Sequence, residues 1–151
     1  METAAKRALP KDAGTLKIRK ARKKDIPGLE ELIEPFVDQG RLLERTYDEL
    51  AQLLTNFFVA ELDGRIVGCA ALEVYNRKLA EVRSLAVAKD MQGRGIGHRL
   101  IKACVKRARA KRVLEVMAIT SADKFFHTCG FDYTLPGEKK ALFLQTRTRS
   151  R

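Results

Sequence analysis

Three glycines at alternate positions, in Gln92-Gly93-Arg94-Gly95-Ile96-Gly97, form the stretch of this 151-residue sequence whose spacing most clearly points to chemistry. An apolar run over residues 84–88 precedes them and a helical apolar pattern over residues 100–108 follows, so a strand is predicted to pass into a helix here. Glycine allows positive φ angles and a close approach of backbone to ligand. The first amides of a helix have no partner within it and attract anions, especially phosphate. The sequence therefore predicts a pyrophosphate-binding loop.

Two common phosphate loops do not match this stretch. A Walker loop ends in Gly-Lys-Ser/Thr, whereas Gly97, His98 and Arg99 stand at the corresponding positions. A dinucleotide-binding fold has its glycines in the first strand-to-helix turn, with an acidic residue about 20 positions later. Here the glycines lie in mid-chain, after three segments that are predicted to form an antiparallel meander. The guest must therefore be another phosphate-bearing ligand.

The elements around the loop follow from apolar periodicity. We expect strands over residues 15–20, 57–62, 65–72, 79–87 and 113–119, the last of them buried. Asp63-Gly64 is typical of a hairpin turn between two of these strands. A final hairpin is predicted from residues 131–133 and 141–145. These predictions give an α/β fold with a mixed central sheet.

Helix signals separate the strands. Asp25 is predicted to cap a first helix that Pro35 ends or kinks, and Thr46-x-x-Glu49 is a capping box for a short second helix. A long helix follows the glycine loop. Ser121 is predicted to cap a short last helix, which Gly130 stops. The helices are expected to flank the sheet.

Composition predicts one globular domain over residues 15–146, with a flexible basic leader at 1–14 and a basic tail at 147–151. No apolar run reaches the about 20 residues that cross a bilayer, and the start of the chain lacks the apolar stretch of a secretory signal. Three widely spaced cysteines are expected to be buried, reduced thiols: Cys69, Cys104 and Cys129. We therefore expect a cytoplasmic protein, with an organelle transit peptide as the alternative because the start of the chain is basic, although it is not serine-rich.

The net charge of +11 would attract polyanions, including nucleic acid. Many of the basic residues follow the glycine loop and would instead attract an anionic cofactor. No aromatic residues alternate with the basic ones, which argues against single-strand binding. His98 and His127 have no acidic partners at ligand spacing, so no metal is expected.

The loop in its setting resembles the acetyl-CoA signature of the GNAT acetyltransferases, Arg/Gln-x-x-Gly-x-Gly/Ala, through Gln92, Gly95 and Gly97. Residues 85–87 resemble the bulged strand of that family, and residues 125–131 resemble its late helix, which ends in Gly-Phe. The resemblance covers about residues 15–145. It implies the GNAT fold, with an antiparallel N-terminal meander, a β-bulge strand and flanking helices, and acetyl-CoA as co-substrate.

By this resemblance, the residues around the loop bind the cofactor. The backbone of the loop would hold the pyrophosphate, and Leu85 and Val87 would pair main-chain groups with the pantetheine arm. The full set of expected cofactor-binding residues is Leu85, Ala86, Val87, Gln92, Gly93, Arg94, Gly95, Ile96, Gly97 and His98.

Within the family, the sequence is most similar to the short, stand-alone N-acetylglutamate synthases of bacterial arginine biosynthesis. The matching stretches include residues 33–35, 42–46, 64–72 and 81–87. This likeness implies L-glutamate as the acceptor. It carries no information on arginine feedback, and a homodimer stays open.

The resemblance assigns the proton chemistry to Glu81, at the start of the strand that carries the thioester contacts. The alternative is a structural glutamate paired with Arg83 or Lys78. Many relatives protonate the leaving thiolate with a tyrosine of the late helix, but Phe126 stands here and cannot donate a proton. Thr120 is a candidate for that role, with helix capping as its alternative.

Arginine is the natural bidentate partner for the carboxylates of glutamate. Arg45 and Arg83 are therefore the main candidates for acceptor binding, with Lys124 as a third. Each of the two arginines has a solvated surface role as its alternative. Other acceptors also stay open: a different amino acid, a small amine or a protein N-terminus. An alternative outside the enzymes is a nucleic-acid-associated protein with a vestigial acetyltransferase fold.

Overall fold

The computed structural model describes residues 7–133 and 141–146 of the chain. The elements, in chain order, are β1 (Lys17–Lys20), α1 (Ile26–Asp38), α2 (Tyr47–Leu53), β2 (Phe57–Leu62), β3 (Arg65–Val74), β4 (Leu79–Val87), α3 (Ile96–Ala110), β5 (Glu115–Ala118) and α4 (Asp123–Thr128). The described residues up to Ser121 belong to one compact unit and those from Ala122 to a second. Among the described residues, no helix is long and apolar enough to span a bilayer.

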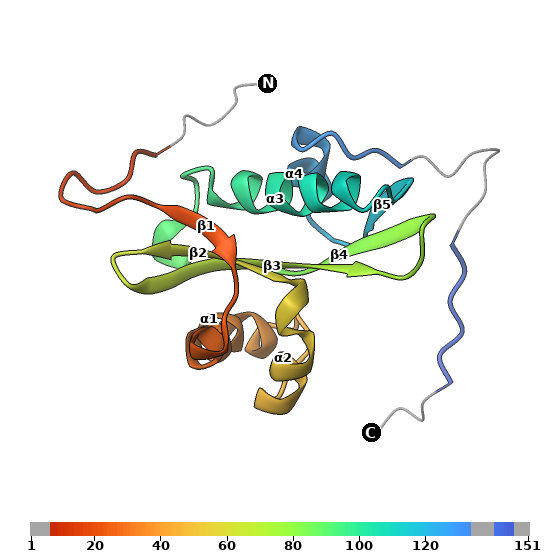
Figure 1. The fold of residues 1–151 in the computed structure, drawn as a ribbon, viewed down its shortest axis with the longest axis horizontal. Coiled ribbons are helices and arrows are strands. Elements are labelled where there is room, and N and C mark those ends of the chain that lie inside the picture. Colours follow the sequence, from red (N-terminus) through yellow and green to blue (C-terminus); the bar gives the residue numbers. More distant parts are fainter. Residues whose placement is uncertain (1–6, 134–140, 147–151) are drawn as a thin grey trace. The chain divides into compact units, whose positions relative to one another are not determined.

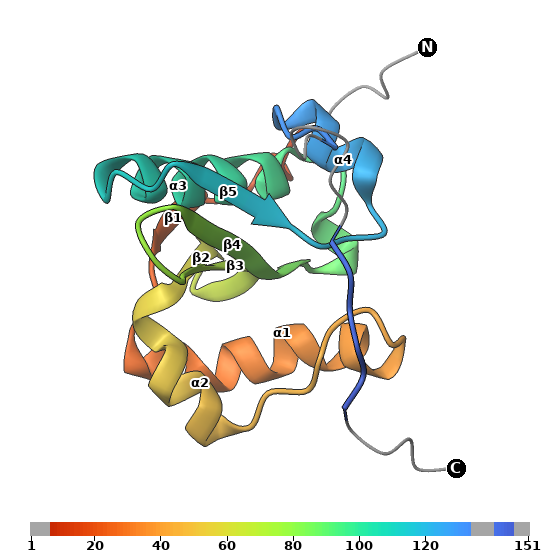
Figure 2. The same ribbon diagram turned by 90° about the vertical axis from the view of Figure 1, so that its right-hand side faces the viewer.

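The first unit is built on a five-stranded sheet in the order β1-β2-β3-β4-β5. The first four strands pair antiparallel, whereas β4 and β5 pair parallel. Helix α3 covers one face of the sheet, and α1 and α2 cover the other (Figure 1). Figure 2 shows the same three layers from the side, with β4 and β5 next to each other under α3. The predicted α/β fold with a mixed sheet is confirmed.

The hairpin between β2 and β3 has the predicted turn. Asp63 and Gly64 both have positive φ, at 50° and 77°, as a two-residue hairpin loop requires. The predicted bounds of β2 and β4 agree with the structure, and β3 continues two residues beyond its predicted end. The sequence pattern therefore predicted the bounds of β4 correctly, and this strand leads directly to the glycine loop.

Helix α3 packs on the sheet through Leu100, Ile101, Cys104 and Ala108, all of which are buried. Gly68 of β3 lies directly beneath its first turns. A Cβ placed on Gly68 would lie 3.0 Å from Leu100 Cδ1 and 3.1 Å from Ile96 Cγ2. The absence of a side chain at Gly68 therefore lets the start of α3 approach the sheet closely.

α1 begins directly after Asp25, as predicted, but the side chain of Asp25 does not make the predicted cap. The carboxylate of Asp25 accepts a hydrogen bond from the Arg22 amide at 2.7 Å and forms a two-bond ion pair with Arg19, at 2.7 and 2.8 Å, rather than capping α1. Arg19 holds the pKa of this buried carboxyl below its ordinary value. Asp25 thus fastens the start of α1 to β1.

Of the two alternatives predicted for Pro35, an end or a kink of α1, the end is wrong, because the helix continues to Asp38 with Pro35 inside it. Proline removes only its own amide, and Gln39 and Gly40 close the following turn by donating to the carbonyls of Pro35 and Val37. The capping box of α2 is confirmed: Thr46 Oγ1 accepts from the Glu49 amide at 3.2 Å, and Glu49 Oε2 from the Thr46 amide at 3.3 Å.

The last part of the chain departs most from expectation. β5 is shorter than the predicted strand and is not buried: its residues are half-buried or exposed, and Leu114 beside it is 77% exposed. α4 has Ala122 rather than Ser121 at its capping position. Residues 131–133 and 141–146 form no strand, and the turn of the predicted final hairpin lies outside the described residues.

Candidate active site

The glycine loop connects β4 to α3 through a 3-10 turn over Lys89–Met91. Gly93 and Gly95 have φ angles of 77° and 82°, in the left-handed region that favours glycine. The first hydrogen bond within α3 runs from the Arg99 amide to the Gly95 carbonyl, so the amides of Ile96 and Gly97 precede it. Such amides, together with the helix dipole, form an anion-binding site.

Side chains hold this loop in place. Arg65 and Asp90 form a two-bond ion pair at 2.8 and 3.0 Å, which ties the start of β3 to the turn before the loop. Gln92 donates from its side-chain amide to the carbonyl of Val87 at 3.0 Å. Gln92, one of the predicted cofactor residues, therefore also fixes the end of β4.

The segment before β1 contacts the loop as well. The amide of Arg7 donates to the Gly93 carbonyl at 2.7 Å, and the guanidinium of Arg94 donates to the carbonyl of Ala8. The Gly14 amide donates a hydrogen bond to the Asp63 carboxylate, at the tip of the β2–β3 hairpin. Residues 7–14, predicted as part of a flexible leader, are thus hydrogen-bonded to the loop and to the hairpin.

β4 carries a bulge where residues 85–87 were expected to have one. Cys69 of β3 pairs with Ala86 and Ala71 pairs with Arg83, so β4 has one residue more than β3 between these pairs. Ser84 has a positive φ of 55°, which is uncommon outside glycine. The Cys69 thiol donates to the Ser84 carbonyl at 3.2 Å, and burial raises the pKa of this thiol to about 12.

The pairing of β4 with β5 stops just before the bulge. Their parallel pairing ends at Val82 and Ala118, whereas β4 continues to Val87. Among the described residues, no strand pairs with β4 on this side over residues 83–87. This edge can therefore form main-chain hydrogen bonds with an extended ligand that leads from the glycine loop towards Glu81.

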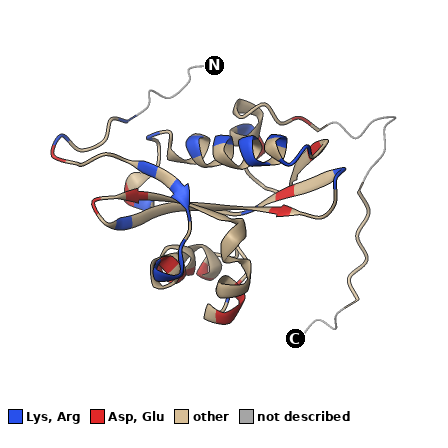
Figure 3. Ribbon diagram, in the orientation of Figure 1, with Lys and Arg blue, Asp and Glu red and all other residues tan. Residues whose placement is uncertain are grey.

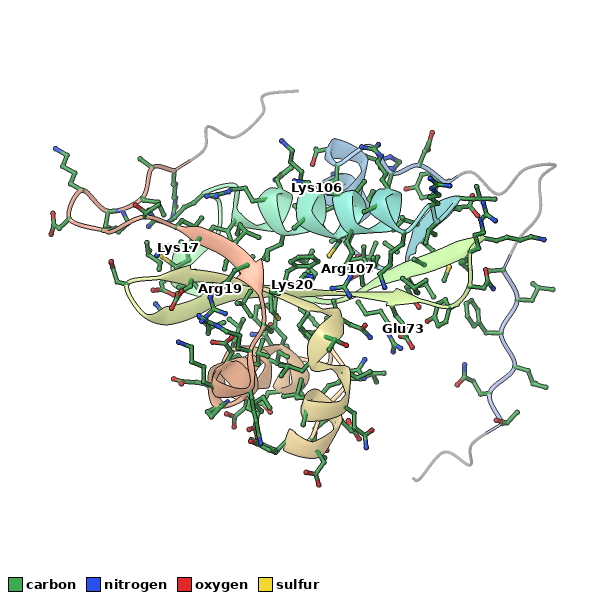
Figure 4. All side chains as sticks on the ribbon, viewed as in Figure 1. Lys17, Arg19, Lys20, Glu73, Lys106 and Arg107 are labelled. Carbon is green, nitrogen blue, oxygen red and sulfur yellow. The ribbon has the colours of Figure 1, made fainter. Side chains whose placement is uncertain are left out.

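Glu81 lies in the paired half of β4 and is 8% exposed. Its Oε1 accepts a hydrogen bond from the Tyr75 hydroxyl at 2.5 Å. Glu73, opposite Glu81 on β3, forms an ion pair with Arg83 at 2.9 Å. Figure 4 shows Glu73 on the side of the sheet where α1 and α2 lie. These four residues form the polar cluster of the sheet, and we refer to them by that name.

The hydrogen bonds of the polar cluster favour a charged Arg83 and a protonated Tyr75 at neutral pH. The hydrogen bond to Glu73 raises the pKa of Arg83 above its ordinary value, so this guanidinium stays charged. Although the Tyr75 side chain is 47% exposed, its partial desolvation, and then the bond to Glu81, raise its pKa to about 12, so its hydroxyl is a donor at neutral pH. Tyr75 and Glu73 were not among the predicted site residues. The sequence signal for Glu73 was the alternation of side chains in β3 and β4, which places Glu73 on the same face as Glu81 and Arg83.

The remaining predicted residues are spread over the chain. Arg45 lies in the loop before α2, and its Nε is buried without a hydrogen-bond partner among the described residues. Thr120 is exposed after β5, and His98 is exposed in the first turn of α3. Lys124 lies in α4, in the second unit. The structure thus brings Glu81 and Arg83 together in one cluster.

A groove of about 1130 Å³ runs along α1 beside the β2–β3 hairpin. Its lining includes Glu31, Gln39, Arg41 and Arg65, and it reaches the glycine loop at Gln92. Neither Glu81 nor Arg83 lines it. The groove is therefore distinct from the polar cluster.

Many basic residues lie along α3, the helix that follows the glycine loop (Figure 3). Arg99, Lys102, Lys106 and Arg109 are exposed along this helix. Arg107 instead turns to the sheet, with its guanidinium 5.9 Å from the centre of the Phe58 ring and 2.7 Å from the Thr55 carbonyl oxygen. The positive helix surface thus adjoins the amides that favour an anion.

The comparison with protein families agrees with this geometry, since residues 26–131 match the model of the acetyltransferase (GNAT) family. The chain belongs to that family. It is an acetyl-CoA-dependent N-acetyltransferase of the GNAT type. The resemblance inferred from residues 85–97 and 125–131 is thereby confirmed.

Two relatives have known structures with coenzyme A. A Mycobacterium tuberculosis protein crystallised with CoA and NLQ is 33% identical, has a TM-score of 0.75, and is matched over 83% of this chain and 76% of its own. N-acetylglutamate synthase from Neisseria gonorrhoeae, crystallised with coenzyme A and N-acetyl-glutamate, is 31% identical with a TM-score of 0.71. The match covers 76% of this chain but only 27% of that synthase.

Two further relatives are amino-acid acetyltransferases. The amino-acid acetyltransferase of Mycobacterium tuberculosis is 35% identical over 117 residues, which cover 76% of this chain and 67% of the relative. The longer amino-acid acetyltransferase of Ralstonia nicotianae is 36% identical over 132 residues, and this chain spans 29% of its length.

The residues present fit coenzyme A. The left-handed glycines and the amides at the start of α3 suit its pyrophosphate, and the edge of β4 over residues 83–87 suits the amide groups of its pantetheine arm. The exposed basic face of α3 suits its negative charge. In this fit the glycine loop would bind the phosphates, and the edge of β4 would align the pantetheine arm.

Proposed function

We propose that this chain acetylates the α-amine of an amino acid, with L-glutamate as the leading acceptor, and so acts in arginine biosynthesis. The observation that carries the proposal is the buried carboxylate of Glu81, held at the point where β4 and β5 are about to separate. The amino-acid acetyltransferases among its relatives, and the N-acetyl-glutamate bound by one of them, support this acceptor class.

Proton transfer is the task of Glu81 in this proposal. An α-amine is mostly protonated at neutral pH and must lose a proton before its nitrogen can attack the thioester carbonyl. The Oε2 atom of Glu81 accepts that proton, directly or through one water. As the new amide bond forms and the carbon–sulfur bond breaks, the nitrogen loses its second proton to water, and water passes this proton on to the leaving thiolate.

Acceptor binding is assigned to arginine. Arg45 has a buried Nε without a described partner, so it has a donor to offer a carboxylate. Arg83 already pairs with Glu73, which is 33% exposed, and retains further donors in its guanidinium. We assign Arg45 the stronger part in binding the carboxylates of glutamate, and Arg83 a supporting one.

The test is a CoA-release assay with each of the twenty amino acids, in which mass spectrometry identifies the acetylated product. We expect L-glutamate to give the highest kcat/KM. Release of CoA with other amino acids but none with glutamate would refute the acceptor, and release with none of them would refute the whole class.

A variant pair tests the base. Glu81→Gln should lower kcat by about 100-fold or more, the usual contribution of general base catalysis, and leave CoA affinity unchanged. Glu30→Gln, at an exposed position of α1, is the matched control and should behave as the wild type. Full activity of Glu81→Gln would assign the base to another group.

A further inference from the structure

Tyr75 begins the turn between β3 and β4, and hydrogen bonds fix its backbone. Its amide donates to the carbonyl of Leu79 at 3.1 Å. The side-chain oxygen of Asn76 accepts from the amides of Lys78 and Leu79, at 2.7 and 3.1 Å. A turn closed in this way restricts where the Tyr75 ring can lie. Its hydroxyl reaches Glu81 Oε1 at 2.5 Å.

The second half of the polar cluster involves Glu73 and Arg83. Because Glu73 and Glu81 are paired residues of neighbouring strands, their side chains lie on the same face, and Arg83, two residues after Glu81, shares it. Arg83 donates to Glu73 rather than to Glu81. An arginine bound to Glu81 would occupy the carboxylate oxygens that a base needs. Glu73 thus binds the cation that would otherwise compete for Glu81.

We infer that Tyr75 is a positioning residue for Glu81, and that Glu73 keeps Arg83 away from the same carboxylate. The inference rests on the proposed role of Glu81 as the base. The Tyr75 hydroxyl occupies Oε1 and leaves Oε2 as the atom that takes the proton from the α-ammonium group. The O–H bond of Tyr75 stays intact throughout, so Tyr75 exchanges no proton with the acceptor.

The experiment compares Tyr75→Phe with the wild type. We expect kcat to fall about 10- to 100-fold, the scale of a misplaced catalytic group, with the KM for acetyl-CoA unchanged. The KM for acetyl-CoA separates a misplaced base from a disturbed fold, because only a disturbed fold would change it. Tyr47→Phe is the matched control, because Tyr47 is 44% exposed and Tyr75 47%. It should retain both kcat and the KM for acetyl-CoA.

Glu73→Gln gives an independent test. Arg83 would lose its partner and turn to Glu81, so kcat should fall although Tyr75 is intact. Replacing Arg83 as well, in Glu73→Gln with Arg83→Gln, should restore part of the turnover rate at saturating acceptor, because the competing cation is gone. No recovery would overturn the role given to Glu73.

The outcomes separate this inference from the proposed function. If Glu81→Gln is fully active, the base assignment fails and the role of Tyr75 fails with it. If Glu81→Gln is inactive while Tyr75→Phe has the wild-type kcat, only the positioning role is overturned. A lower kcat together with a changed KM for acetyl-CoA and a lower melting temperature would show a purely structural tyrosine, which also overturns it.

Discussion

A methyl group at Gly68 should disturb the start of α3 and, through it, the phosphate loop. The Cβ would lie 3.0 Å from Leu100 Cδ1, 3.1 Å from Ile96 Cγ2 and 3.3 Å from the carbonyl oxygen of Ala86. The two methyl groups can turn aside, but the backbone oxygen cannot. Overpacking of this kind costs about 1–3 kcal/mol, against a gain of about 0.4–1 kcal/mol from a stiffer unfolded chain. We expect Gly68→Ala to lose about 1 kcal/mol.

Gly68→Val should lose more stability than Gly68→Ala, because two further methyl groups enter the same space. Urea denaturation gives the free energy of unfolding, and calorimetric titration gives the Kd for CoA. Since Ile96 opens α3 directly after the glycine loop, we expect the CoA affinity of Gly68→Val to fall about tenfold, equal to about 1.4 kcal/mol. Wild-type stability and wild-type Kd in this variant would refute the packing argument.

A double-mutant cycle isolates the contact. Leu100→Ala removes the closest side-chain atom and by itself costs about 2–5 kcal/mol. When Gly68→Ala is combined with Leu100→Ala, the methyl group added on β3 should enter part of that cavity. The two single losses should therefore sum to more than the measured loss by about 1 kcal/mol. Strict additivity would show that Gly68 and α3 do not press on each other.

Two further predictions concern the loop and the start of α1. Gly95→Glu should abolish CoA binding in calorimetric titration, because Gly95 is held at a φ of 82° and the new carboxylate would repel phosphate; retained affinity would contradict the loop assignment. Asp25→Asn should lose about 2–3 kcal/mol of stability at pH 7, since it breaks the pair with Arg19. Because the pKa of Asp25 is lowered in the folded state, this loss should be full above about pH 4 and shrink as the pH falls further, in urea titrations of both proteins. An equal difference at pH 3 and pH 7 would refute the linkage.

Elements with strong local signals could be predicted from the sequence. β2 and β4 are runs rich in apolar residues with turn residues beside them, and Asp63-Gly64 fits the turn that joins β2 to β3. The end of α1 could not be predicted in the same way, because Pro35 removes one hydrogen bond and the following turn forms regardless. β5 could not be predicted as exposed, since its apolar composition resembles that of a buried strand.

The same distinction between local and long-range features applies to the predicted site. The glycine loop is contiguous in sequence, so its residue types and spacing were sufficient to predict left-handed glycines between a strand and a helix. The polar cluster depends on which residues the strand register places opposite each other, and Tyr75 enters it from a turn that gave no chemical signal. Arg83 was predicted to bind substrate, but only the register reveals that Glu73 already pairs with it.

The bulge in β4 explains how one strand serves two sides of the sheet. Glu81 and Arg83 point away from α3, because the alternate positions of β3 that include Gly68 face that helix. With regular alternation, Val87 would share the side of Glu81 and Arg83. The extra residue reverses the alternation, and Val87 instead pairs with Gly68, on the side of α3. The strand therefore presents its carboxylate towards α1 and α2 and still delivers the chain to the glycine loop at the start of α3, so donor and acceptor can approach β4 from different sides.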